Sequence, residues 1–404
     1  GRIEGSAQYT IINCTFSNNW ADDYGGAIYN GVDKPLTIIN SSFDKNTADD
    51  DNGGAIYSKG DLDIINSTFT SNNADDDGGA IYCEKSIYLE NSLFEKNKAK
   101  VDGGAIYSKN NVTVTKNTRF YSNNATGATS AQCYGGAIRS EGNVEVEGSS
   151  FNDNIAGDYG GAIYAKSASI SSAGFERNKA DDNYGGAVYV EDSVDVMSTT
   201  FSSNHAGDHG GAIYSKNRVF AKNTRFTSNY ARHKGSSVRC EGDVIIEDCY
   251  SAYNWAYNQG SIAAAGDIYI KNSEFRKDEV TNFGAAVYGE KNLYVDNGYF
   301  SECHAQEKGG AIYCKNNVIA VNSRFDGNVV FYSWEDDSWS NEGGGIYCKG
   351  DVAIDNCSFI RNEAREAGGA IYADTITWGN SSSEFRDNYA KYDGGGAIYV
   401  NKFN

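Results

Sequence analysis

The chain has 404 residues, of which 40% are hydrophobic, with 46 Gly but only 1 Pro. This composition allows a packed core and excludes both wholesale disorder and a collagen-like chain. The 35 basic and 54 acidic residues give a net charge of −19, which argues against nucleic acid and anionic membrane surfaces as partners. No apolar run approaches the roughly 18 residues of a membrane-spanning helix, so we expect no membrane span.

One pentapeptide, GGAIY, recurs along the whole chain. Its last position falls at fifteen sites between Tyr29 and Tyr399, most of them 25 residues apart. A second motif, F-x-x-N, recurs in the same phase, as at Phe69 and Asn72. A fixed period of this length is typical of a solenoid. We therefore predict one continuous domain over residues 1–404, in place of the two or three domains that length alone suggests.

Within each repeat, a segment of alternating hydrophobicity lies between GGAIY and the next Phe, as at residues 62–66, 112–114 and 244–246. Alternation with β-branched residues, bounded by Gly, Asn and Asp, indicates a strand. Three short strands in one repeat suit one coil of a parallel β-helix, and no stretch has the periodicity of a helix. The predicted fold class is all-β, a solenoid of about fifteen coils with roughly 25 residues per coil.

Differences between the repeats indicate which side chains point inward. The fourth residue of the pentapeptide is Ile or Val in every copy, whereas the fifth also accepts Arg139, Arg239 and Ala263. We expect the Ile or Val side chains to fill the interior together with the stacked Phe, and the Tyr to face outward. The paired Gly fit a corner that requires a positive φ or a close backbone approach.

Two sets of Asn recur with the repeat, and both are expected to be structural. One set lies three residues before each Phe, from Asn13 to Asn356, where Asn tolerates the left-handed conformation of a turn. The other set is the Asn of F-x-x-N, whose stacked carboxamides can hydrogen-bond from coil to coil. This predicted ladder includes Asn19, Asn46, Asn72, Asn97, Asn123, Asn154, Asn178, Asn204 and Asn229.

The string NSTFTSN at residues 66–72, followed by GGAIY at residues 78–82, is the fullest form of the repeat. It resembles the repeats of chlamydial polymorphic outer membrane proteins and of adhesin-like surface proteins of methanogenic archaea. The resemblance covers essentially the whole chain. It implies a right-handed parallel β-helix and an extracellular or cell-surface role that is usually adhesive.

The nine Cys lack the CxxC spacing of zinc sites. Cys314 and Cys348 occupy the same phase in successive coils, and stacking at about 5 Å would allow a disulfide between them. Cys240 with Cys249 and Cys348 with Cys357 are alternative pairs within a coil. Buried free thiols are the other interpretation, because Cys packs as a small hydrophobic residue.

Seven N-x-[ST] sequons are present. Several of them fall on the Asn set that precedes Phe, where an inward side chain could not accept a glycan. On that argument Asn111 and Asn124 are the better candidate acceptors.

The segment between F-x-x-N and GG is rich in Asp in many repeats, and stacked carboxylates there could bind Ca²⁺. The weak candidates are Asp49, Asp50, Asp75 and Asp76. The calcium-binding nonapeptide of β-rolls is missing, so a solvated acidic edge is favoured and no cofactor or other metal is expected.

All four His lie on this edge, and His205, His209 and His233 belong to neighbouring coils. No HExxH motif is present, so a metalloprotease is excluded. Solvated loop histidines are favoured over a metal site.

The same edge holds the loop insertions at residues 124–134 and 329–342, and insertions on one edge of a solenoid commonly mark its interaction face. Aromatic side chains there and in the degenerate tenth repeat could stack on sugar rings or anchor a partner protein. These ligand-binding candidates are Tyr332, Trp334, Trp339, Tyr253, Trp255 and Tyr257.

The acidic residues recur with the repeat and do not gather in one catalytic constellation, and no nucleophile motif is present. We expect a non-enzymatic extracellular or cell-surface protein with no catalytic residues. Its partner is a host, cell-surface or carbohydrate ligand, or the chain itself, because neither end shows a polar cap and coils could stack head to tail into a filament. The alternative is a polysaccharide lyase or hydrolase on the same scaffold.

Overall fold

The computed structural model describes residues 2–3, 8–127, 132–331, 341–392 and 394–402, and all regular elements in these ranges are β-strands. No helix long and apolar enough to cross a membrane occurs among them. The chain divides into two compact units, unit 1 (Gly1–Gly207 and Ala212–Tyr214) and unit 2 (Asp208–Gly211 and Ser215–Asn404). Together the units hold about fifteen coils of roughly 25 residues, which confirms the predicted all-β parallel β-helix.

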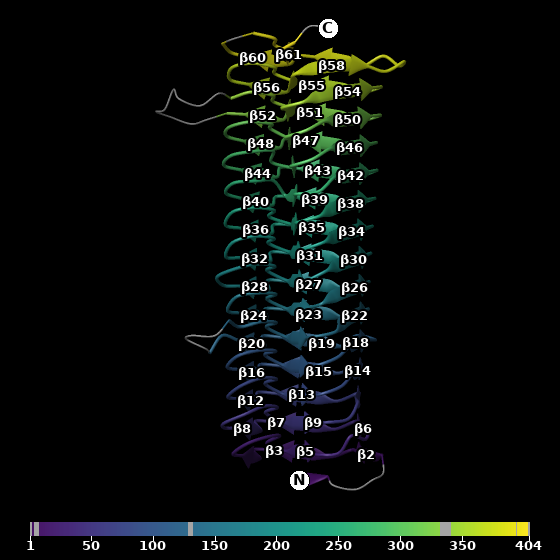
Figure 1. Ribbon diagram of the computed structural model, residues 1–404, viewed down its shortest axis with the longest axis vertical. Coiled ribbons are helices and arrows are strands. Elements are labelled where there is room, and N and C mark those ends of the chain that lie inside the picture. The colour runs from purple at the N-terminus through teal and green to yellow at the C-terminus, as the bar shows by residue number, and fades with distance from the viewer. Residues whose placement is uncertain (1, 4–7, 128–131, 332–340, 393, 403–404) are drawn as a thin grey trace. The chain divides into compact units, whose positions relative to one another are not determined.

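Each coil contributes one strand to each of four parallel sheets, which we call sheets A to D (Figure 1). One coil of unit 1 consists of β9 (Ile56–Ser58), β10 (Leu62–Ile65), β11 (Thr68–Thr70) and β12 (Asn73–Ala74). Each strand pairs with the equivalent strand of the next coil, so that Phe69 lies opposite Phe94. The sequence predicted three strands per coil. The fourth was missed because a strand of two residues is too short to show alternation.

The four sheets recur in both units. In unit 1 the first and last strands of sheets A to D are β1 (Arg2–Ile3) and β29 (Val188–Val190), β2 (Tyr9–Ile12) and β30 (Ser193–Met197), β3 (Thr15–Ser17) and β31 (Thr200–Ser202), and β4 (Trp20–Ala21) and β32 (His205–Ala206). In unit 2 they are β37 (Val238–Cys240) and β61 (Ile398–Val400), β34 (Arg218–Lys222) and β58 (Thr375–Trp378), β35 (Arg225–Thr227) and β59 (Glu384–Arg386), and β36 (Tyr230–Ala231) and β60 (Tyr389–Ala390).

Stacked Phe rings fill the interior, as predicted. Phe43 and Phe69 are fully buried, with their ring centroids 4.6 Å apart and their planes within 1° of parallel. The register places the same residue type at the same height in each coil, so apolar side chains pack on copies of themselves. This repetition gives each short coil a continuous core that it could not form alone.

The Tyr of the pentapeptide point away from the Phe core, as expected, but most of them are buried and not exposed to solvent. Strand alternation turns Tyr82 away from Ile81 and Cys83, so the Tyr side chains form clusters of their own outside the Phe core. Within one cluster, however, Tyr57, Tyr82 and Tyr107 are only 6–8% exposed. Successive rings stack at 5.0 and 4.9 Å, and each ring therefore shields its neighbours from water.

The two Gly of the pentapeptide are required for different reasons. Gly78 has φ +67°, a conformation that L side chains rarely adopt. A Cβ on Gly79 would lie 2.1 Å from the carbonyl oxygen of Gly104 in the next coil. The first Gly therefore makes the corner, and the second allows successive coils to approach at the corner.

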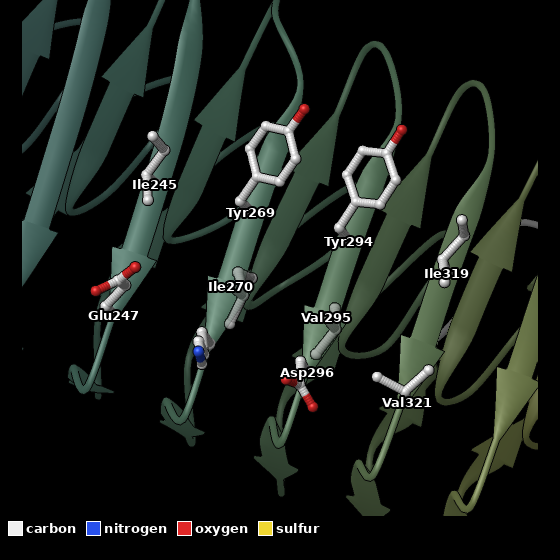
Figure 2. A pocket seen from close by; sticks show the side chains of 10 residues that line it. Ile245, Glu247, Tyr269, Ile270, Tyr294, Val295, Asp296, Ile319 and Val321 are labelled. Carbon is white, nitrogen blue, oxygen red and sulfur yellow. The ribbon is translucent and has the colours of Figure 1, made fainter.

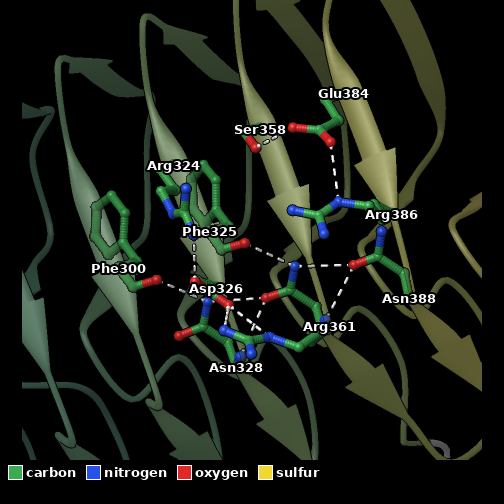
Figure 3. Close-up of polar contacts among 11 residues, drawn as sticks. Phe300, Arg324, Phe325, Asp326, Asn328, Ser358, Arg361, Glu384, Arg386 and Asn388 are labelled. Carbon is green, nitrogen blue, oxygen red and sulfur yellow. Dashed lines mark hydrogen bonds and ion pairs between the residues drawn. The ribbon is translucent and has the colours of Figure 1, made fainter.

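The Asn of F-x-x-N form a buried ladder. In Figure 3, Asn328 Nδ2 donates to Asn362 Oδ1 (2.9 Å) and to the carbonyl of Phe300 (3.0 Å), and Asn362 repeats the pattern with Asn388 (3.0 Å). Eight of the nine predicted ladder residues, Asn46 to Asn229, are 0–1% exposed, and Asn19 is exposed but still donates to Asn46 Oδ1 (2.8 Å). Each carboxamide thus satisfies polar groups of the turn that would otherwise be buried without partners.

Candidate functional site

The outer face of sheet B in unit 2 is the most distinctive surface of the described residues. Its central strands are β38 (Asp243–Glu247), β42 (Ile268–Lys271), β46 (Leu293–Asp296) and β50 (Val318–Val321). In each strand, fully buried apolar residues alternate with partly or fully exposed ones. The parallel register then aligns the outward residues of the four strands into rows.

The first row is apolar and aromatic. Ile245, Tyr269, Tyr294 and Ile319 lie opposite one another in register, and Figure 2 shows them side by side on neighbouring strands. The Tyr269 and Tyr294 rings stack with centroids 4.8 Å apart and planes within 5° of parallel. Tyr269 is 40% exposed and Ile319 is 42% exposed, so the row is open to solvent.

The second row adds charges of both signs. Glu247, Lys271, Asp296 and Val321 are opposite one another in the same register. The two rows line a groove of about 320 Å³ (Figure 2). Partial burial, followed by nearby carboxylates, raises the pKa of Tyr269, so its hydroxyl remains protonated and able to donate a hydrogen bond at neutral pH. The groove therefore offers flat aromatic surface beside donors and acceptors.

The aromatic residues singled out from the sequence do not line this groove. Tyr332, Trp334 and Trp339 lie outside the described residues. The second patch is on sheet D, where Trp255 begins β40 (Trp255–Ala256) and stacks on Tyr230 at 5.2 Å. Its two companions are exposed, Tyr253 at 59% and Tyr257 at 51%.

Sequence reasoning missed Tyr269 and Tyr294, although a signal was present. The segment Ile268–Lys271 reads as a hydrophobic strand, in which an outward Tyr cannot be told from a core residue. Aligning the repeats strand by strand would have shown that the residue between the two inward positions is polar in most early coils, with Tyr88 as the exception, and is Tyr in the two successive coils of Tyr269 and Tyr294.

All nine Cys are free thiols, so none of the predicted disulfides is present. Cys314 and Cys348 do lie opposite each other in β49 (Ile312–Cys314) and β53 (Ile346–Cys348), as their spacing predicted. Each thiol instead lies 2.9 Å from a backbone carbonyl, that of Lys291 for Cys314 and that of Asn316 for Cys348. The structure corresponds to the alternative interpretation, in which buried thiols pack as part of the coil.

The other three disulfide candidates are also buried thiols. Burial raises the pKa of Cys240 to about 11 and that of Cys249 to about 12, and it also raises the pKa of Cys357. These thiols are therefore protonated at neutral pH. Each contacts a backbone carbonyl of its own coil, as Cys240 does that of Asp243 at 3.5 Å. Cys249 and Cys357 also contact a carbonyl of the preceding coil, at 3.4 and 3.2 Å.

The weak Ca²⁺ candidates are not gathered into a site. Asp49 and Asp50 are exposed, and Asp75 accepts a 2.9 Å contact from Lys100 Nζ. Burial raises the pKa of the neighbouring Asp76, so part of the expected charge at this edge is weakened. Within the described ranges, the only group of three or more potential metal-ligating side chains is elsewhere, at Asp208, His209 and His233.

The Asn that precede Phe do not point inward, although an inward direction was the reason for preferring Asn111 and Asn124 as glycan acceptors. The Asn that precede Phe have φ of 46–62°, as predicted for the left-handed turn, but their side chains are at the surface. Asn91 Nδ2, for example, donates to Asn66 Oδ1 at 2.9 Å in an exposed row. Asn111 is exposed and Asn124 is half-buried, so exposure does not separate them from the other sequons.

Comparison with known families supports the fold and the type of repeat. A model of the right-handed β-helix region matches residues 2–173 and 56–231, which together span more than half of the chain. A Chlamydia polymorphic membrane protein repeat matches residues 356–374. Neither curated proteins nor solved structures gave a match. The two family matches confirm the resemblance seen in the GGAIY and F-x-x-N motifs.

Proposed function

Because the chain belongs to the right-handed β-helix family, we propose that it is a non-enzymatic surface protein that binds carbohydrate on the outer face of sheet B in unit 2. The polymorphic membrane protein repeat at residues 356–374 supports a surface-exposed, adhesin-like role. The fold alone does not decide function, so the proposal depends on the chemistry of this face.

The observation that supports carbohydrate most directly is the stacked pair Tyr269 and Tyr294. The two parallel rings, 4.8 Å apart, hold each other rigid, and their uncovered edges together with Ile245 and Ile319 form an apolar surface on which the C–H groups of a sugar can pack at little entropic cost. The flanking row provides acceptors for sugar hydroxyls at Glu247 and Asp296 and a donor at Lys271. An apolar surface bordered by a few polar groups is the usual composition of a small-molecule site.

The test is glycan-array screening of the full chain, followed by calorimetry with the best ligand. The double variant Tyr269→Ala/Tyr294→Ala is expected to bind at least about tenfold more weakly, because two stacking surfaces are lost. Tyr88→Ala is the matched control, since Tyr88 is also an outward residue of sheet B, in β14 (Ile87–Glu90) of unit 1. Equal loss in both variants, or unchanged affinity of the double variant, would contradict the proposed face.

The same screen distinguishes binding from catalysis. Incubation with acidic and neutral polysaccharides is expected to leave chain length unchanged, and reproducible cleavage that disappears with one acidic substitution would favour the lyase or hydrolase alternative. Head-to-tail self-assembly stays a prediction from the sequence, which sedimentation velocity over a range of concentrations would test.

A further inference from the structure

Two histidines and a carboxylate from two coils of unit 2 converge at one point. His233 Nδ1 lies 2.6 Å from Asp208 Oδ1, and His209 Nδ1 lies 3.0 Å from the same oxygen. The two imidazole rings are 6.0 Å apart, and one ligand atom from each residue lies within 4.8 Å of the others. The cluster is half-buried, with side-chain exposures of 25% for Asp208, 18% for His209 and 42% for His233.

The backbone holds these residues in place. His233 N donates to the Asp208 carbonyl at 2.8 Å, and His209 forms a parallel bridge with Lys234. Asp208 and His209 therefore belong to one coil and His233 to the next, at the same level of the coil. Because ladder hydrogen bonds fix both segments, the three side chains meet without an ordering cost for a long loop.

We propose that Asp208, His209 and His233 bind a divalent transition-metal ion of the Zn²⁺ type. Two imidazole nitrogens and one carboxylate suit Zn²⁺, Ni²⁺ or Cu²⁺, whereas Ca²⁺ and Mg²⁺ prefer ligand sets composed of oxygen. In a tetrahedral Zn²⁺ site with bonds of about 2.0–2.2 Å, ligand atoms are about 3.3–3.6 Å apart. The observed separations of 2.6 and 3.0 Å need to open by less than about 1 Å, which side-chain rotation can supply.

Two cations, Lys234 and Arg239, lie close to His209 and would repel a metal ion. Arg239 is paired with Glu241, with both carboxylate oxygens 3.1 Å from Nη2, and this pairing offsets its repulsion of a metal ion.

Such an ion would join two successive coils, so binding would stabilise the folded protein. With three protein ligands, a fourth position remains for water or for a group of a binding partner. This site is independent of the groove on sheet B, and a failure of carbohydrate binding would leave it unaffected.

The experiment is titration of the full chain with Zn²⁺ by calorimetry and with Co²⁺ by visible absorption, each compared with Ca²⁺. One equivalent of Zn²⁺ is expected to bind and to raise the melting temperature, because the ion would join two successive coils of the folded chain. His233→Ala and Asp208→Asn are each expected to weaken Zn²⁺ binding at least about tenfold and to abolish the thermal shift.

His304→Ala is the matched control, because His304 is a histidine of unit 2, in β48 (His304–Ala305), outside the cluster. It is expected to bind Zn²⁺ as tightly as the unaltered chain. Three results would overturn the proposal: no Zn²⁺ binding at millimolar concentration, equal binding by His233→Ala and the unaltered chain, or binding of Ca²⁺ in preference to Zn²⁺. Circular dichroism of each variant without metal separates loss of ligands from loss of fold.

Discussion

Along sheet B, the outward position of each strand is polar in most coils of unit 1 and apolar or aromatic in most coils of unit 2. In unit 1 the aligned residues are Thr10, Thr37, Asp63, Tyr88, Thr113, Glu145, Ser169 and Asp195. In unit 2 they are Phe220, Ile245, Tyr269, Tyr294, Ile319, Ala353 and Thr377. The inward residues on either side are apolar in both units, so the coil constrains only one face of the strand. The free face is where the units differ in chemistry.

A groove on the outer face of sheet B does not by itself distinguish the two units. Unit 1 has a groove of about 480 Å³ on the same face, larger than that of unit 2, but polar side chains such as Thr113, Glu145 and Asp195 line it. Polar groups at an exposed surface are already hydrated, and their contacts with a sugar replace contacts with water at little net gain. We therefore attribute the proposed carbohydrate affinity of the unit 2 groove to its stacked Tyr rings and not to its volume.

The interiors of the two units also differ. The Phe stack of unit 1 is continuous from Phe16 to Phe201. In unit 2, Ser251 takes the Phe position between Phe226 and Phe275, and Asp278 takes an Asn position of the ladder. Ser251 Oγ donates to Asp278 Oδ2 at 2.9 Å, so the two departures compensate each other. A polar group enters this core only with its partner.

The largest expected effect tests this difference at the Phe position of the core stack. Phe175→Ala in unit 1 should destabilise the fold by about 3–5 kcal/mol, because it opens a cavity in a continuous stack. Ser251→Ala in unit 2 should cost less, about 1–3 kcal/mol, because the loss is that of the buried hydrogen bonds between its hydroxyl and Asp278, Asn254 and Ser261. Denaturant unfolding followed by circular dichroism measures both. Equal losses would show that Ser251 packs as tightly as Phe.

The next largest effect is the pH dependence of stability that arises from the buried carboxyl group of Asp278. Burial raises the pKa of Asp278 to about 7, so the folded state holds a proton that the unfolded chain has released above pH 4. Stability should fall as pH rises from about 4 to 7. Asp278→Asn removes this dependence and should stabilise the chain by about 2–4 kcal/mol at pH 8, with little effect at pH 4.

The reverse change in unit 1, Asn178→Asp, provides the control. It introduces a carboxyl at a ladder position that is 0% exposed, and it should destabilise the chain most above neutral pH. Urea midpoints measured from pH 4 to pH 8 distinguish the two variants. Parallel pH profiles for Asp278→Asn and the unaltered chain would contradict the assignment of a shifted pKa to Asp278.

The sequence predicts those parts of the fold that recur in every repeat. GGAIY and F-x-x-N recur because corners, core and ladder are rebuilt in every coil, and these features were predicted residue by residue. The burial of Tyr82 was not, because it depends on rings from adjacent coils, which single-strand alternation does not show. The exposure of Asn91 was missed because a left-handed turn fixes its backbone but not the direction of its side chain.

The candidate sites are features of particular coils, and the sequence predicts them less well. Tyr269 and Tyr294 become a surface only when parallel register places them opposite each other. His209 and His233 were assigned to neighbouring coils, but the path of the backbone decides that Asp208 joins them. Distances between coils are set by packing, so spacing along the chain predicts which residues share a level but not which side chains converge.

A gain of binding would sharpen the comparison of the two outer faces. Tyr88 in unit 1 lies opposite Thr113 of β18 (Val112–Thr115), so Thr113→Tyr would place two Tyr side by side, as in unit 2. An added stacked pair is worth about 0.5–1.5 kcal/mol, so affinity for the unit 2 ligand should rise about 2- to 10-fold when the unit 2 groove is disabled by Tyr294→Ala. Thr113→Ala in the same background is the control, and calorimetry is the measurement. No gain would mean that the charged row of unit 2 is also required.

The smallest expected effect compares ion pairs at the turn before the Asn ladder. In unit 1, Arg177 pairs with Asp153 at 2.7 Å, and in unit 2, Arg361 pairs with Asp326 at 2.7 Å, close to Arg324 (Figure 3). Burial alone would raise the pKa of Asp326, but hydrogen bonds from the two Arg lower it below its usual range. A lowered carboxyl pKa contributes stability that is present near neutral pH and lost as pH falls through the folded pKa.

Arg361→Gln should therefore move acid unfolding to a slightly higher pH. Arg177→Gln should move it less, because Asp153 is 28% exposed and Asp326 only 7%. Acid titration followed by circular dichroism measures both shifts, and a larger shift for Arg177→Gln would reverse the order that burial predicts.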